Sequence, residues 1–194
     1  MREKASVGAS RRGRCYVAHV AQTGDRFELP DGSTYEVTAA AADSDGEFVG
    51  MTFTLPRGSA APPPHVHPTQ TEEYEVVEGE LDLMVDGEWS TLRAGESASV
   101  PPEVLHTFKN RSGSTVRVGN VHRPALRFED YIEHIYRLLE SRGIESAKDP
   151  KVPLYLSMLM LEYPETLRPG RARERIGIRA LAALGRLFRL NTTP

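Results

Sequence analysis

The sequence predicts a mainly β protein, a barrel or sandwich of short strands that is followed by a helical segment. Short runs of β-favouring residues recur from about residue 14 to residue 121 and are separated by glycine and proline turns, a pattern typical of all-β sandwiches and barrels. After Pro124 the apolar residues change to a spacing of three and four, which is the helical period. The charge also changes along the chain, because the β section is acidic and both ends are rich in arginine.

The expected strands are short and follow one another closely. In chain order they span residues 14–20, 25–29, 35–41, 47–55, 72–78, 80–85, 88–92, 98–100, 106–109 and 115–121. Alternation within 47–55 puts Met51, Phe53 and Leu55 on one face. A Pro-Asp-Gly turn occupies 30–32, and Asp86-Gly87 predicts a tight hairpin with a primed turn.

Three apolar segments follow the strands. Residues 128–142 carry one apolar stripe and end at Gly143, which predicts an amphipathic helix. Residues 152–161 form an apolar block that is too short to cross a bilayer. Residues 172–190 alternate arginines with large apolar residues and predict a basic amphipathic helix, whose apolar members are Ile176, Leu181, Leu184, Leu187 and Phe188. Packing against the barrel or a second subunit is the simpler interpretation, and an anionic lipid surface is the alternative.

A length of 194 residues suffices for one well-buried domain with an appendage. We expect a basic N-terminal arm over 1–20 with room for a first strand, a barrel over 21–123 and a helical extension over 124–194. The few arginines of the arm are weak evidence for nucleic-acid binding, because the chain as a whole has a net negative charge. No nucleic-acid partner is therefore expected. No integral membrane segment and no secretory signal are expected either, which favours a cytoplasmic location.

Three histidines and one glutamate have the spacing of a metal site. His65 and His67 stand two apart in Pro-His-Val-His-Pro, so in an extended strand they project the same way, about 7 Å apart. Glu72 begins the next strand after a turn at Pro68, and His106 comes from a distant strand. Four donors from separate β segments can thus meet around one ion.

These residues resemble the two motifs of the cupin superfamily, in particular its small single-domain bacterial members. The first motif matches at Gly58, His65, His67, Glu72 and Gly79, and the second at Gly95, Pro101, His106 and Asn110. The resemblance implies a jelly-roll β-barrel with a metal held by His65, His67, Glu72 and His106. It also implies a homodimer, for which the 152–161 block and the N-terminal strand offer apolar surface.

One residue departs from the second motif. Glu103 stands where the motif has a glycine, and a glycine there permits a positive φ that a glutamate adopts only at a cost. The sequence leaves open what this costs: a rebuilt turn is one outcome, and a Glu103 side chain that faces the mouth of the pocket is another.

Other residues are candidates for the pocket. If Glu72 points inward, Tyr74 does too, and Asn120 and His122 share the inward face of the last strand. A buried tyrosine that anchors the core is the plainer interpretation of Tyr74. His122 is first interpreted as structural, as are the other isolated histidines, His19 and His134. An apolar wall is expected from Met51, Phe53, Leu83 and Phe108, and it favours a small, partly apolar substrate.

Imidazole and carboxylate donors suit one divalent transition ion, namely Fe, Mn, Ni, Cu, Co or Zn. The resemblance implies a small-molecule enzyme of the dioxygenase type with an open three-His, one-Glu site. A non-oxidative metal-dependent isomerase, lyase or cyclase is the first alternative, and a non-catalytic module that binds or senses a small molecule is the second. The fold does not choose among them.

Overall fold

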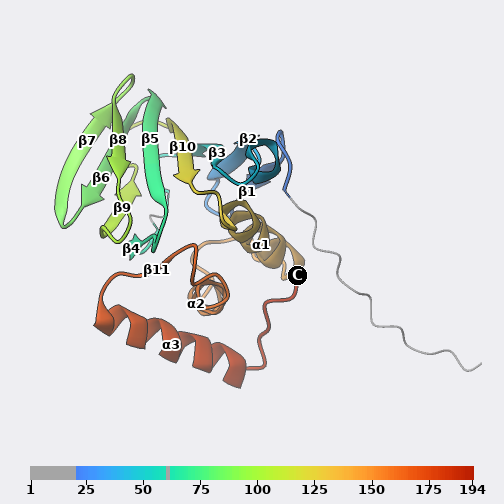
Figure 1. Cartoon of the computed structure of the whole chain (residues 1–194). Coiled ribbons are helices and arrows are strands. Elements are labelled where there is room, and N and C mark those ends of the chain that lie inside the picture. The colour runs from blue at the N-terminus through green and yellow to red at the C-terminus, as the bar shows by residue number, and fades with distance from the viewer. Residues whose placement is uncertain (1–20, 60–61) are drawn as a thin grey trace, which may run out of the picture.

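The computed structural model describes residues 21–59 and 62–194 (Figure 1). The predicted arm and strand within 1–20 lie outside the described residues. The strands are β1 (Arg26–Glu28), β2 (Thr34–Ala39), β3 (Val49–Leu55), β4 (His65–Val66), β5 (Thr71–Glu78), β6 (Glu80–Val85), β7 (Glu88–Arg93), β8 (Ser97–Val100), β9 (His106–Lys109), β10 (Val116–Arg123) and β11 (Arg168–Pro169). The helices are the 3₁₀ turn η1 (Ala41–Ser44) and the α-helices α1 (Phe128–Ser141), α2 (Val152–Met160) and α3 (Ala172–Leu187).

The strands form two antiparallel sheets that face each other as a jelly roll. One sheet has the order β1-β2-β3-β10-β5-β8 and the other the order β11-β4-β9-β6-β7. Alternation sets the inside and outside of each strand, as in β10, where Val116, Val118, Asn120 and His122 are buried and Arg117 is exposed. The prediction of a mainly β jelly roll with C-terminal helices is confirmed.

Two turns show why the register holds. Asp86 and Gly87 both have positive φ, of 51° and 93°, which is the primed turn that the sequence predicts between β6 and β7. Gly79 separates β5 from β6 with a φ of 82°, and a Cβ there would lie 2.7 Å from the carbonyl oxygen of Thr115. Only glycine fits at that position.

Two apolar clusters divide the interior. The barrel cluster lies between the two sheets and includes Phe53, Tyr74, Leu83 and Phe108. A second cluster joins the outer part of the larger sheet to the helices, and Met51 belongs to it. The predicted apolar wall is therefore wrong in one member, because Met51 packs toward the helices and not with Phe53, Leu83 and Phe108.

The helices cover one end of the barrel (Figure 1). The predicted stripe of α1 is confirmed, since Phe128, Tyr131, Ile132 and Ile135 are all buried. α2 lies between α1 and α3 and buries seven of its nine residues within the same chain. The apolar block of 152–161 is consequently not free to form a subunit interface, and the homodimer stays a prediction.

A two-residue strand ties the extension to the barrel. Arg168 of β11 pairs with Val66 and Pro169 pairs with His65, so β11 becomes the edge neighbour of β4. This strand was not predicted, because two residues show no periodicity. Among the helices of the described residues, none is long and apolar enough to cross a bilayer.

Candidate metal centre

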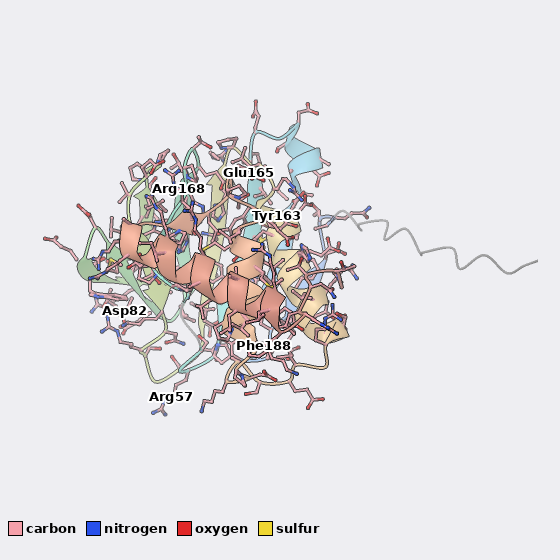
Figure 2. All side chains as sticks on the ribbon, turned by 90° about the horizontal axis from the view of Figure 1, so that it is seen from below. Arg57, Asp82, Tyr163, Glu165, Arg168 and Phe188 are labelled. Atoms are coloured by element: carbon pink, nitrogen blue, oxygen red, sulfur yellow. The ribbon has the colours of Figure 1, made fainter. Side chains whose placement is uncertain are left out.

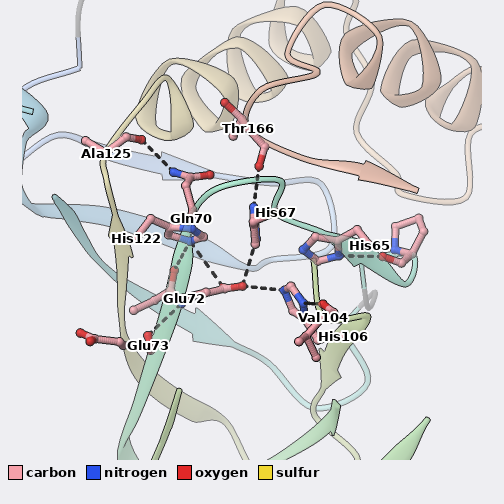
Figure 3. Close-up of polar contacts among 12 residues, drawn as sticks. His65, His67, Gln70, Glu72, Glu73, Val104, His106, His122, Ala125 and Thr166 are labelled. Atoms are coloured by element: carbon pink, nitrogen blue, oxygen red, sulfur yellow. Dashed lines mark hydrogen bonds and ion pairs between the residues drawn. The ribbon is translucent and has the colours of Figure 1, made fainter. Parts of the chain in front are cut away.

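The jelly roll brings the four predicted ligands together in its interior. His65 starts β4, His67 follows it, Glu72 is the second residue of β5, and His106 starts β9. One donor atom from each lies within 4.8 Å of every other, and all four side chains are buried. Register explains the meeting, since His65 is paired directly with His106 across the β4–β9 ladder. Figure 3 shows His67 and His106 joined to the Glu72 carboxylate, with the ring of His65 next to that of His106.

Each imidazole is oriented by a backbone carbonyl. His65 Nδ1 lies 2.9 Å from the oxygen of Pro63, and His106 Nδ1 lies 2.8 Å from that of Val104. Both acceptors stand two residues before their histidine. A carbonyl oxygen can only accept, so each Nδ1 carries the proton and each Nε2 is left with its lone pair.

His67 has the same arrangement with a remote acceptor. Its Nδ1 lies 2.6 Å from the carbonyl oxygen of Thr166, which belongs to the segment between α2 and β11. The extension thus fixes the ring of one predicted ligand. Sequence reasoning missed Thr166, because nothing local marks a backbone acceptor that lies 99 positions away.

The lone pairs converge on one carboxylate oxygen. Glu72 Oε2 lies 2.7 Å from His106 Nε2 and 3.1 Å from His67 Nε2. A carboxylate also offers only acceptors, so these atoms approach one another favourably only when a cation lies among them. That cation is either a proton on an imidazole or a metal ion, and the donor set fits a divalent transition ion.

The titration of the site reflects the same crowding. Burial alone would raise the pKa of the Glu72 carboxyl, but the nearby imidazoles of His122, His106 and His67 outweigh it and hold the pKa well below its usual range. Burial lowers the pKa of His65 to about 3, with help from the charges of the neighbouring histidines. Burial also opposes protonation of His106, yet the hydrogen bond and charge of Glu72 raise its pKa. Glu72 therefore stays ionised, and His65 stays neutral.

The two candidates on β10 support Glu72 from behind. Asn120 Nδ2 donates to Glu72 Oε1 at 2.9 Å, which leaves Oε2 to face the imidazoles. His122 Nε2 lies 2.9 Å from Asn120 Oδ1, and its ring stacks on Phe128 of α1 with centroids 3.5 Å apart. Phe128 was not predicted here, because its apolar stripe indicated only a helix that packs somewhere.

Tyr74 lies on the same inward face, with its ring against Phe53 and Phe108. Its hydroxyl is buried and has no hydrogen-bond partner among the described residues. Burial and the charge of Glu72 raise the pKa of Tyr74 well above its usual value. The hydroxyl stays protonated beside the Glu72 carboxylate, although it makes no hydrogen bond of standard geometry among the described residues.

Glu103 keeps the conformation of the glycine that it replaces. Its φ is 64°, and its backbone N–H donates to the carbonyl oxygen of His67 at 2.9 Å. A rebuilt turn, one of the two outcomes that the sequence leaves open, is therefore wrong. The glutamate side chain forms an ion pair with Arg168 of β11. His67 is thus held at its backbone by the turn at Glu103 and at its imidazole by the extension at Thr166.

The remaining predicted residues lie apart from the centre. Asn110 of the second motif donates to the carbonyl oxygens of Leu55 and Ser114 and so fixes a turn. His134 contacts the hydroxyl of Tyr163 and the carbonyl of Thr192, as the structural interpretation expects. His19 lies outside the described residues.

Comparison with known proteins agrees with this geometry. Residues 51–122 match the Cupin_2 family, described as a cupin domain. The chain is 28% identical over 104 residues to quercetin 2,3-dioxygenase of Bacillus subtilis (strain 168), covering 53% of this chain and 31% of that protein. It is 41% identical over 54 residues to the HTH-type transcriptional regulator SutR of Escherichia coli (strain K12), covering 27% of this chain and 30% of that protein. The chain thus spans about a third of the length of these curated relatives.

Among solved structures, an RmlC-like cupin from Shewanella frigidimarina NCIMB 400 aligns with a TM-score of 0.45 at 23% identity, over 53% of this chain and 85% of that one.

Proposed function

This chain contains a cupin domain, and on that premise we propose that it binds one divalent transition ion and acts on a small molecule, with a dioxygenase-type reaction as the first candidate. The observation that carries the proposal is the approach of the lone pairs of His67 and His106 to Glu72 Oε2. A proton between these atoms would give a buried imidazole a positive charge. A divalent ion instead binds all four donor atoms at once.

His65, His67, Glu72 and His106 would hold the ion. When bound, such an ion supplies Lewis acidity and, if it is redox-active, a means of using O₂. The chain's own residues do the orienting: three backbone carbonyls fix the imidazoles, and Asn120 fixes the carboxylate. Outer partners of this kind keep ligands in place and tune their basicity.

Tyr74 is the proposed hydrogen-bond donor to the substrate. Its hydroxyl is buried without a partner among the described residues, and leaving such a group unsatisfied costs about 1–3 kcal/mol. An acceptor atom of a substrate or of water would remove that cost. The aromatic rings of Phe53 and Phe108 beside it favour a ligand that is small and partly apolar.

The test begins with the metal. Protein purified without added metal and without a histidine tag is assayed for bound ions, and each candidate ion is then restored to the stripped protein. Oxygen uptake is measured with a panel of small aromatic and lipophilic compounds. Uptake that depends on both a redox-active ion and a compound supports the dioxygenase-type reaction. Turnover with zinc under anaerobic conditions would instead identify a non-oxidative enzyme.

Two variants separate binding from chemistry. His106→Gln should abolish stoichiometric metal binding. Tyr74→Phe should retain the metal and lower kcat on the order of 100-fold, as loss of a donor to the reacting group does. A Tyr74→Phe enzyme with unchanged kcat would exclude the proposed role of the hydroxyl.

The second candidate is a module that binds a small molecule without converting it. It is favoured by the 41% identity over 54 residues to a transcriptional regulator. A compound that protects the metal-loaded protein against thermal unfolding, yet is recovered unchanged after long incubation with every candidate ion, would favour this function over catalysis.

A further inference from the structure

Helix α3 leaves its large apolar side chains in solvent. Four of the seven large apolar side chains that are exposed in the described residues belong to it or to the residue after it. Ile176 is 70% exposed, Leu187 76% and Phe188 62%, while Leu184 is 40% exposed. Figure 2 shows α3 lying across the outside of the molecule, with Phe188 at its end.

The fully buried positions of α3 are small residues, and Ile178 is partly buried against the core. The small residues are Ala182 and Gly185, and a Cβ on Gly185 would lie 2.7 Å from Met158 Sδ of α2. The predicted amphipathic helix is confirmed, but most of its predicted apolar stripe faces outward. Of its isoleucines and leucines, Ile178 is partly buried against the core, whereas Ile176, Leu184 and Leu187 are exposed. A helix that served only to cover α2 would bury these three as well, because their transfer from water is the main gain from packing.

The exposed face has a defined form. Ile176, Ala180, Ala183 and Leu187 are spaced by four, three and four, so they form one line along the helix. Arg173, Arg179 and Arg186 flank this line, and Arg189 follows the helix. The helix of 16 residues is about 24 Å long at 1.5 Å per residue.

Within residues 21–59 and 62–194 these arginines have no carboxylate partner. No carboxylate of the described chain lies within ion-pair distance of Arg173, Arg179, Arg186 or Arg189. Glu174 is the one acidic residue in the helix, and it accepts from the backbone N–H of Arg171 at the helix start. The exposed face is therefore apolar along its centre, and the positive charges along its margins are not balanced by carboxylates of the described residues.

We propose that α3 is a docking surface for an anionic lipid bilayer, on which it lies parallel to the membrane. The apolar line would enter the boundary between headgroups and acyl chains, and the flanking arginines would contact lipid phosphates. Charge complementarity favours this occupant over a second copy of the chain. Two α3 helices placed face to face would bring two sets of unpaired arginines into one seam. One short helix also offers little of the roughly 800 Å² per partner that a stable interface needs.

The experiment uses the full chain and vesicles of defined lipid. Phosphatidylcholine vesicles and vesicles containing phosphatidylglycerol are sedimented with the protein at low and high salt. We expect binding to the phosphatidylglycerol vesicles alone, with a loss of binding at high salt because screening weakens the arginine contacts. Equal binding to both lipids, or to neither, would overturn the proposal.

Matched variants test each half of the surface. Arg179→Gln with Arg186→Gln should weaken partitioning roughly 30-fold, whereas Arg57→Gln with Arg117→Gln should change it by less than about two-fold. Ile176→Ser with Leu187→Ser should weaken it on the order of ten-fold or more, and Val77→Ser, which alters an exposed apolar residue of β5, should not. The proposal fails if the control variants lose as much binding as the α3 variants.

A fluorescent reporter distinguishes lipid from a second copy. Phe188→Trp in a Trp89→Phe background leaves one tryptophan, placed at the end of α3. Its emission should shift to the blue with phosphatidylglycerol vesicles and be quenched by brominated acyl chains. An emission that is already blue without lipid, together with a dimer by light scattering that Ile176→Ser and Leu187→Ser convert to a monomer, would assign the surface to a second copy and refute lipid docking.

Discussion

The imidazole Nδ1 of His67 donates a 2.6 Å hydrogen bond to the carbonyl oxygen of Thr166, which lies in the C-terminal extension. His65 and His106 find the same kind of acceptor two residues before themselves. The helical extension therefore contributes to the candidate metal centre directly, and its strand β11 pairs with the strand that carries His65.

The tautomers of these histidines are the first prediction. In zinc-loaded protein, ¹⁵N spectra of labelled histidine should show His65, His67 and His106 protonated at Nδ1. His134 is an internal control, because its Nε2 must donate to the Thr192 carbonyl while Nδ1 accepts from the Tyr163 hydroxyl. It should show the opposite tautomer. Protonation of His67 at Nε2 would contradict the assigned hydrogen bond.

Metal affinity should fall on acidification, starting above the ordinary histidine pKa of about 6.5. Glu72 raises the pKa of His106 against the effect of burial, so without metal His106 keeps its second proton to a higher pH than a free imidazole does, and the ion must displace it there. His65, with a pKa of about 3, adds no dependence in this range. Calorimetric titrations in buffers of different ionisation enthalpy should detect proton release near neutral pH. A metal affinity that does not change between neutral and mildly acidic pH would contradict the displacement of a proton from His106 by the ion.

The stability of the metal-free protein should have the opposite dependence. A folded-state pKa of His106 that is raised above the unfolded value stabilises the fold below the unfolded pKa, and this stabilisation is lost as pH rises through the folded pKa. Glu72, whose folded pKa is lowered, stabilises the fold above the unfolded value of about 4.3 and loses that effect as pH falls. Urea unfolding of stripped protein across this range should show a maximum between the two.

Asn120→Ala should weaken metal binding by about 10- to 100-fold, because Glu72 loses the donor that orients its carboxylate. The fold should also lose about 1–3 kcal/mol of unfolding free energy through the unsatisfied acceptor. Chelator competition measures the first effect and urea unfolding the second. An unchanged dissociation constant would show that Asn120 does not position Glu72.

Glu103→Gly should be at least as stable as the parent protein. The left-handed φ of 64° costs a non-glycine residue about 1–2 kcal/mol, and the exposed ion pair with Arg168 returns at most about 1 kcal/mol. Glu103→Ala keeps the strained backbone and loses the ion pair, so it should be less stable than both. Unfolding free energies of the three proteins decide the order.

A feature of this structure could be predicted from the sequence when it is determined by residues that are close together in the chain. His65 and His67 share a direction because strands alternate, and the Asp86-Gly87 turn needs only two residues that tolerate positive φ. Thr166 and Phe128 reach the centre only through packing of the extension, so no local pattern predicts them. The conformation of Glu103 could not be predicted for a related reason. Its backbone N–H and its side chain both find partners across the chain, and these partners hold a conformation that local preference disfavours.

Periodicity likewise predicted helix α3 but not the side on which it packs. The spacing of Ile176, Leu184 and Leu187 indicates an amphipathic helix, and apolar residues are normally buried. The side on which α3 packs is set by its fit to α2, where a Cβ on Gly185 would lie 2.7 Å from Met158 Sδ and 3.5 Å from Leu154 Cβ. Close approach of two helices through small residues is a property of the pair, and one helix alone does not encode it.

Two glycines of α3 provide a matched test of that orientation. Both lie inside the helix, so alanine should be preferred at either by about 0.5–1 kcal/mol on backbone grounds alone. Gly177 is exposed, and a Cβ added there would have no neighbouring atom within 4 Å, so Gly177→Ala should raise the unfolding free energy by that full amount. Gly185→Ala must displace the flexible side chain of Met158, and this rearrangement offsets the backbone gain, so Gly185→Ala should be less stable than Gly177→Ala. Urea unfolding of both variants measures the difference. If Gly185→Ala stabilises the protein as much as Gly177→Ala does, the small side of α3 is not the side that packs, and the assignment of its outer face falls with it.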